Sequence, residues 1–215
     1  METESSEFCR LILIRHPELA ARNSAIGSGS VDLSRRGRAS VLRWLQLLEP
    51  VPIDGLYSSD QTQCSEPASA LANHKGLELT TDPRLRDQSM GEWQGQPWED
   101  LLQEDTTRVR DFFSNFGDSQ PPGGESLGAA VERLLAWWTE LSPSSAGKTL
   151  AAVLPGSLIA GFSAAMLGMR LSRSVSLSLP HGAMGVLDVF ANGVRMQSWN
   201  PDGLGPDEGS STISP

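Results

Sequence analysis

The sequence of 215 residues contains only two cysteines, Cys9 and Cys64, and it has no CxxC pair. Zinc sites and disulfide-rich domains place several cysteines at short, regular spacings. We therefore expect neither a disulfide framework nor a zinc site. No other segment has metal-ligand spacing, so we expect no metal and no organic cofactor.

Basic residues are also scarce, because 17 Lys and Arg stand against 26 Asp and Glu and give a formal net charge of −9. Nucleic acids and anionic membranes bind clustered cations, so the composition argues against both as partners. Any pocket for a phosphate group must then be locally basic within an acidic molecule. Nothing in the composition specifies an oligomeric state.

Long apolar runs are missing as well. No run approaches the roughly 20 residues needed to cross a bilayer. The first residues, METESSEF, are acidic and contain no apolar stretch of the signal-peptide kind. We expect a soluble, cytoplasmic protein.

Short apolar runs alternate with segments of helical periodicity, which predicts an α/β fold. The predicted strands cover residues 9–14, 53–60, 77–85, 149–154, 174–180 and 185–200, the last with a hairpin turn at Ala191-Asn192-Gly193. The predicted helices cover residues 34–49, 62–74, 127–141 and 157–169, and a further helix begins near residue 98. We expect three α/β/α layers around a mostly parallel sheet. One domain then spans residues 1–203, with a small helical cap over about 96–126 and a flexible tail over 204–215.

Three predicted strands end in polar or turn residues that carry the chemistry. Ligands of such sheets bind beyond the carboxyl ends of the strands, so we expect Arg15-His16, Ser58-Ser59 and Pro155-Gly156 on one rim. An arginine fork binds phosphate or carboxylate oxygens, and a neutral imidazole is a nucleophile near neutral pH. This rim is the candidate site.

Six ordered segments resemble the histidine phosphatase superfamily, the phosphoglycerate-mutase-like group, and particularly its small phosphatase branch. They are LILIRHPE, VDLSRRGRAS, IDGLYSSDQTQCSEPASALA, LRDQSMGEWQGQPWEDL, PPGGESLGAAVERL and TLAAVLPGSLIAGFSAAMLG. The most specific pieces are the Arg-His strand end, GxWxG at 91–95 and PGGES at 122–126. The resemblance covers about residues 9–200.

The resemblance implies phosphoryl transfer through a phosphohistidine. In that scheme His16 is the nucleophile and Arg15 a phosphate ligand, although Pro17 replaces the glycine that commonly follows the histidine. Asn23 lies near the family's polar phosphate-contacting position, one residue off the usual spacing. Asp87 occupies the place of a glutamate that acts as general acid, with a side chain one methylene shorter.

Two departures from the family affect the phosphate pocket. Gln63 stands where the family has a second arginine, and Pro155 stands where it has a second histidine. The transition state of phosphoryl transfer needs hydrogen-bond donors that are already in position. Each lost donor costs about 2.7–4 kcal/mol of transition-state stabilisation. We therefore expect a catalytically impaired homologue that still binds inorganic phosphate or a small phosphorylated metabolite.

Two other readings remain open. An active phosphomonoesterase would need groups that compensate for the lost donors, of which His181 is the nearest candidate. The flanking arginines are further candidates: Arg35, Arg36, Arg84 and Arg86. A non-catalytic interaction protein is the other reading. The predicted pocket also includes Ser59, Pro155 and Gly156, with Ser157 as a further phosphate ligand.

Overall fold

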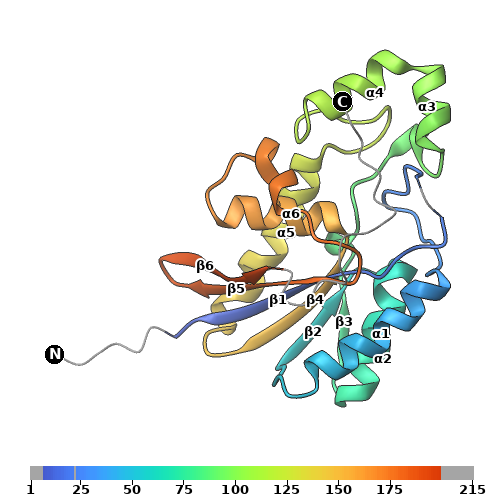
Figure 1. The fold of residues 1–215 in the computed structure, drawn as a ribbon. Helices are drawn as coiled ribbons and strands as arrows, with labels where there is room; N and C mark the ends of the chain where they lie inside the picture. The colour runs from blue at the N-terminus through green and yellow to red at the C-terminus, as the bar shows by residue number, and fades with distance from the viewer. Residues whose placement is uncertain (1–6, 22, 200–215) are drawn as a thin grey trace.

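The structure, a computed structural model, describes residues 7–21 and 23–199; the expected tail at 204–215 lies outside the described residues. Its centre is a six-stranded sheet in the order β3-β2-β4-β1-β5-β6 (Figure 1). The strands are β1 (Cys9–Arg15), β2 (Gly55–Ser58), β3 (Leu79–Thr81), β4 (Thr149–Leu154), β5 (Met184–Phe190) and β6 (Gly193–Trp199). β1 to β4 run parallel to one another, β5 runs antiparallel to β1, and β6 runs antiparallel to β5 at that edge of the sheet.

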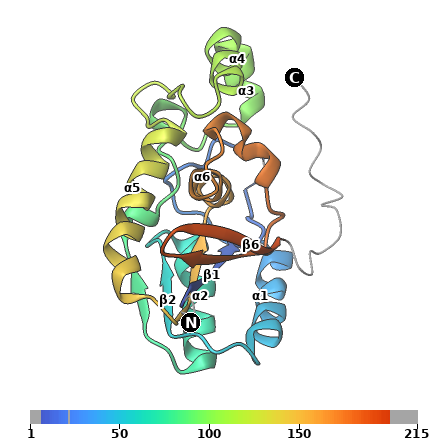
Figure 2. The ribbon, with the colours of Figure 1, turned by 90° about the vertical axis from the view of Figure 1, so that its left-hand side faces the viewer.

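Helices cover both faces of this sheet, as the alternation of elements predicts (Figure 2). The α-helices are α1 (Arg35–Leu48), α2 (Thr62–Lys75), α3 (Trp98–Glu104), α4 (Thr106–Ser114), α5 (Leu127–Leu141) and α6 (Gly156–Met166). Short 3-10 turns are η1 (Pro83–Leu85), η2 (Gly91–Trp93), η3 (Ser142–Ser144) and η4 (Leu171–Leu177). The three-layer α/β fold is therefore confirmed, with a mixed rather than wholly parallel sheet.

The central strand β1 contains an unbroken apolar run, Leu11 to Ile14, because both faces of the strand are buried there. Leu11 and Leu13 pack in the cluster that contains buried residues of α5 and α6. Ile12 and Ile14, which point the other way, pack with buried residues of α1 and α2. Alternate side chains of a strand face opposite sides of the sheet, so one apolar run serves both layers.

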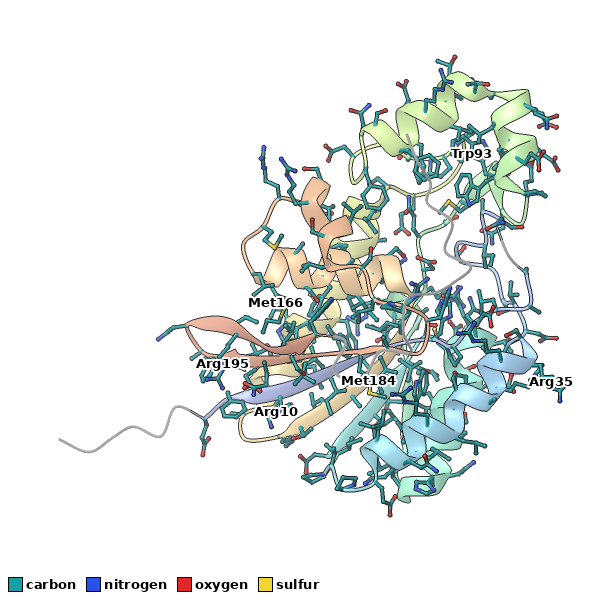
Figure 3. All side chains as sticks on the ribbon, viewed as in Figure 1. Arg10, Arg35, Trp93, Met166, Met184 and Arg195 are labelled. Carbon is teal, nitrogen blue, oxygen red and sulfur yellow. The ribbon has the colours of Figure 1, made fainter. Side chains whose placement is uncertain are left out.

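The helices α3 and α4 lie beyond the carboxyl ends of the parallel strands and have a small apolar cluster of their own (Figure 1). This cluster joins Leu101 of α3 to Val109 and Phe112 of α4, and it includes Trp93 and Ala25. Figure 3 shows Trp93 in this region of the molecule. The segment expected as a helical cap thus packs mainly through side chains of the cap itself and of its flanking loops.

The prediction of a strand over residues 174–180 is wrong, because most of this segment forms the 3-10 turn η4 (Leu171–Leu177) beside α6. The alternating apolar and small residues of SVSLSLP imitate strand periodicity. Both edges of β1 are already paired, with β4 on one side and β5 on the other. The predicted extended segment at 77–85 is likewise shorter, with β3 over Leu79–Thr81, while the hairpin after Phe190 is confirmed.

Within residues 7–21 and 23–199, no helix combines the length and the apolar character that a membrane span requires.

The packing of α1 against the sheet predicts a large stability difference between two leucines of the same helix. Leu48 is 3% exposed and Leu42 is 64% exposed. Leu48→Ala should lower the free energy of unfolding by about 2–5 kcal/mol because it leaves a cavity, whereas Leu42→Ala should change it by no more than about 0.5 kcal/mol. Urea denaturation of both variants measures the difference; equal effects would contradict the packing described for α1.

Candidate functional site

Strand register brings the three sequence-predicted tips to one edge of the sheet. Arg15 is paired with Leu154, and Ser58 is paired with Val153 on the other side of β4. His16 continues from β1, and its backbone N–H donates to the Leu154 carbonyl at 3.1 Å. The expectation that these tips share a rim is therefore confirmed.

Helix α6 begins directly at this rim. Pro155 is its N-cap residue, and Gly156 is its first helical residue. A Cβ atom at Gly156 would lie 2.6 Å from Nε of Arg15, so only glycine fits beside this guanidinium. The first backbone N–H groups of an α-helix have no partner within the helix. Arg15 therefore lies against a helix end that is itself rich in donors.

The His16 side chain is buried and oriented by the chain that follows it. Its Nδ1 lies 2.8 Å from the carbonyl oxygen of Pro17. A carbonyl oxygen can only accept, so Nδ1 carries the proton and Nε2 is the unprotonated nitrogen. Burial, together with the nearby His181 and Arg15, lowers the pKa of His16 to about 3. At neutral pH this side chain is an uncharged imidazole with the lone pair that a nucleophile needs.

His181 lies against both members of the Arg15-His16 pair. The His16 and His181 ring centroids are 5.1 Å apart. Nη2 of Arg15 is 3.0 Å from Nε2 of His181, and Nη1 of Arg15 donates to the carbonyl of Leu179. Nδ1 of His181 is 3.4 Å from the carbonyl oxygen of His16. Although the strand predicted before it does not form, His181 does reach the rim.

The turn that carries His181 is anchored from two directions. The Gly182 N–H faces the carbonyl oxygens of Arg15 and His16, each at 3.2 Å. Nε1 of Trp44, a buried residue of α1, donates to the Gly182 carbonyl at 2.8 Å. Trp44 is a residue that sequence reasoning missed, and its only signal was an aromatic on the apolar face of a predicted helix.

Asp87 lies next to the first turn of α6. Its Oδ1 accepts from Oγ of Ser157 at 2.6 Å and from the Gln88 N–H at 2.8 Å. Burial raises the pKa of Asp87, and the hydrogen bonds and nearby arginines only partly offset this. The Arg133 guanidinium donates to the Asp87 carbonyl at 2.9 Å and fixes the loop from the α5 side.

The Gln63 side chain is directed at a loop instead of at the histidines. Its Oε1 accepts from the Val31 N–H at 3.1 Å, and its Nε2 donates to the Gly29 carbonyl at 2.9 Å. The neighbouring Gln61, which sequence reasoning missed, donates to the carbonyls of Gly27 and Gly29 and accepts from the Asp87 N–H. These two glutamines hold the loop of residues 27–31. The repeated glutamine in SSDQTQ was the only sequence signal for this role.

The remaining predicted residues are Asn23, Ser59 and Pro155. Asn23 is exposed at a φ of 56°, and its carbonyl accepts from the Trp98 N–H. Ser59 is fully buried, with Oγ 3.5 Å from Oε1 of Gln61. Pro155 is buried at the start of α6.

The flanking arginines are mostly engaged in ion pairs elsewhere. Arg84 pairs with Asp82 and Glu140, and Arg86 pairs with Asp60. Arg35 and Arg36 are exposed on α1, and Figure 3 shows Arg35 at the outer side of that helix. Among the residues that the structure describes, no group of three His, Cys, Asp or Glu is placed to hold a metal ion.

Comparison with known proteins gives consistent matches over most of the chain. The sequence model of the histidine phosphatase superfamily (branch 1) matches residues 11–202. Phosphoglycerate mutase-like protein 4 of Arabidopsis thaliana is 28% identical over 163 residues, which are 74% of this chain and 71% of that protein. Glucosyl-3-phosphoglycerate phosphatase of Mycolicibacterium vanbaalenii is 28% identical over 171 residues, 74% of this chain and 75% of that protein.

Solved structures show the same likeness in three dimensions. A mycobacterial glucosyl-3-phosphoglycerate phosphatase in complex with inorganic phosphate superposes with a TM-score of 0.77 at 25% identity, over 89% of this chain and 97% of that chain.

The buried, neutral His16 predicts a specific pH dependence of folding. Its pKa is lowered to about 3 in the folded protein, whereas an unfolded histidine titrates near about 6.5. The unfolded state therefore binds a proton that the folded state rejects, and stability falls as the pH drops through this window by up to about 1.4 kcal/mol per pH unit. Urea denaturation at several pH values should show a shallower fall for His16→Gln. An unchanged slope in that variant would contradict a neutral His16.

Proposed function

Because this chain belongs to the histidine phosphatase superfamily, we propose that it is an impaired homologue that binds inorganic phosphate or a small phosphorylated metabolite. The ligand would lie between Arg15, His16 and the first turn of α6. The observation that carries this proposal is a contrast, at one edge of the sheet, between the Arg15-His16 pair and the residues at positions 63 and 155. His16 and Arg15 keep a phosphate-ready arrangement, whereas positions 63 and 155 direct no cationic donor toward it.

Binding is supported by the donors that remain at the rim. Arg15 is permanently charged, and α6 presents its N-terminal amides beside it, which is a favourable environment for an oxyanion. Ser157 adds a hydroxyl in the same first turn, although it now donates to Asp87. The phosphate complex of the mycobacterial relative shows that this fold can hold the anion in a homologous protein.

Impaired turnover is supported by the two substituted positions. Pro155 has no backbone N–H and no side-chain donor. The amide of Gln63 is uncharged, and both of its polar atoms are hydrogen-bonded to the loop of residues 27–31. Loss of one donor to a transition state typically slows the chemical step about 10²–10³-fold, so the two losses together make efficient catalysis unfavourable.

A working phosphomonoesterase is the second candidate, and the burial of Asp87 beside the first turn of α6 favours it. Burial raises the pKa of Asp87, which lets the carboxyl group hold a proton to a higher pH. In this scheme Nε2 of His16 attacks phosphorus, the ester P–O bond breaks, and the leaving oxygen takes the proton of Asp87. Water then hydrolyses the phosphohistidine, with its proton returning to the Asp87 carboxylate.

The binding proposal predicts thermal stabilisation by inorganic phosphate. Phosphate at about 100-fold its Kd should add about 2.7 kcal/mol to the free energy of unfolding, read as an increase in Tm. Arg15→Gln should abolish most of the increase, whereas Arg36→Gln, which removes the same charge from an exposed site on α1, should retain it. No increase for the unsubstituted protein at any phosphate concentration would contradict the proposal and favour a non-catalytic interaction protein.

The missing-donor argument predicts a gain of activity at position 155. The backbone there, with φ −64° and ψ 147°, accommodates any residue. Pro155→His should raise the turnover of an aryl phosphate by about 10²-fold or more over Pro155→Ala, which restores the N–H without a donor side chain. The gain should disappear when His16→Ala is added. His16-dependent turnover in the unsubstituted protein would instead support the phosphomonoesterase.

A further inference from the structure

We propose that His181 is a second anion ligand whose action depends on a proton. Without a ligand, its neutral ring accepts a hydrogen bond from Arg15. When an anion enters, the ring takes up one proton and donates it from Nε2 to the anion. This inference rests on the proposed function, because it concerns the same anion site.

The ligand-free geometry determines the protonation state of His181. A guanidinium group has only donors, so the 3.0 Å contact between Nη2 of Arg15 and Nε2 of His181 requires an unprotonated Nε2. The ring proton is then on Nδ1, which faces the carbonyl oxygen of His16 at 3.4 Å. Both nitrogens of His181 are thus satisfied in its neutral form.

The same geometry places His181 where an incoming anion must act. Nη2 of Arg15 is a donor that a phosphate-like ligand would use, and it is directed at the imidazole. An oxyanion that binds Nη2 of Arg15 must break the contact between Arg15 and His181. Nε2 would then present a lone pair to an oxygen that also carries lone pairs, which is repulsive.

One proton removes this conflict. A protonated Nε2 becomes a charged donor, and the negative charge of the anion favours the protonated ring. Histidine is the side chain that changes its charge between about pH 5 and about pH 8. His181 would then supply the cationic donor that Pro155 lacks.

The titratable groups around His181 do not provide the same response. Arg15 and His16 face it directly from the end of β1. Arg15 keeps its charge at every relevant pH. His16 stays neutral chiefly because burial lowers its pKa to about 3. Asp87, which faces α6 and interacts with Arg15, is a further titratable group at this rim among residues 7–21 and 23–199.

Sulfate is the appropriate ligand for a test because its own charge does not change in this pH range. Isothermal titration calorimetry from about pH 5.5 to about pH 8.5 should show about tenfold tighter binding for each unit by which the pH falls, over the range in which free His181 is neutral. Titrations in buffers of different ionisation enthalpy should show uptake of about one proton per sulfate over that range.

Two variants identify the group that takes up the proton. His181→Gln keeps hydrogen-bonding atoms but cannot titrate, so its sulfate affinity should lose the pH dependence. Asp87→Asn removes the carboxyl group of Asp87, a second titratable group at the rim. The sulfate affinity of this variant should keep its pH dependence. Binding that depends on pH in His181→Gln but not in Asp87→Asn would overturn the proposal and identify Asp87 as the group.

Ligand-free protein provides an independent readout. Nitrogen-15 spectra of the imidazoles at high pH should show the proton of His181 on Nδ1, and the opposite tautomer would contradict the inference. Sulfate binding without proton uptake would contradict this inference alone. Absence of sulfate binding at every pH, in contrast, would contradict the proposed function as well.

Discussion

The structure of the rim, at the carboxyl ends of the parallel strands, depends on the small number of charged groups that its buried interior tolerates. One guanidinium and two imidazoles meet there, and the fold keeps only the guanidinium charged in the ligand-free state. His16 is neutral because it is buried and faces Arg15, and His181 accepts a hydrogen bond that a protonated ring would refuse. An anion reverses this balance, because its negative charge stabilises a second positive group beside Arg15. In the proposed site, anion binding and protonation of His181 would therefore be linked.

The substituted positions are integrated into the structure. Gln63 fastens the loop of residues 27–31 together with Gln61, and Pro155 caps α6 with a backbone suited to a helix start. An arginine at position 63 has no acceptor, so it would lose the hydrogen bond from the Val31 N–H. The chain thus has the architecture of the histidine phosphatase superfamily, and Gln63 holds a neighbouring loop while Pro155 starts α6.

Much of the fold could be predicted because apolar periodicity reports burial. The run CRLILI predicts a strand covered on both faces, and β1 has such faces. The same reasoning failed at SVSLSLP, whose alternation imitates strand periodicity although most of the segment forms the 3-10 turn η4 beside α6. The candidate site was only partly predictable: the strand tips were placed on one rim, but the direction of each side chain was not.

The amino-acid sequence alone indicates most of the order of the elements, the Arg15-His16 pair at the end of β1, and the uncharged residues at positions 63 and 155. Only the tertiary structure decided that Gln63 binds a loop, that Asp87 meets Ser157, and that His181 lies on Arg15. The physical reason is distance along the chain. Periodicity and turn signals act between near neighbours, whereas each of these contacts joins segments that only the folded sheet and helices bring together.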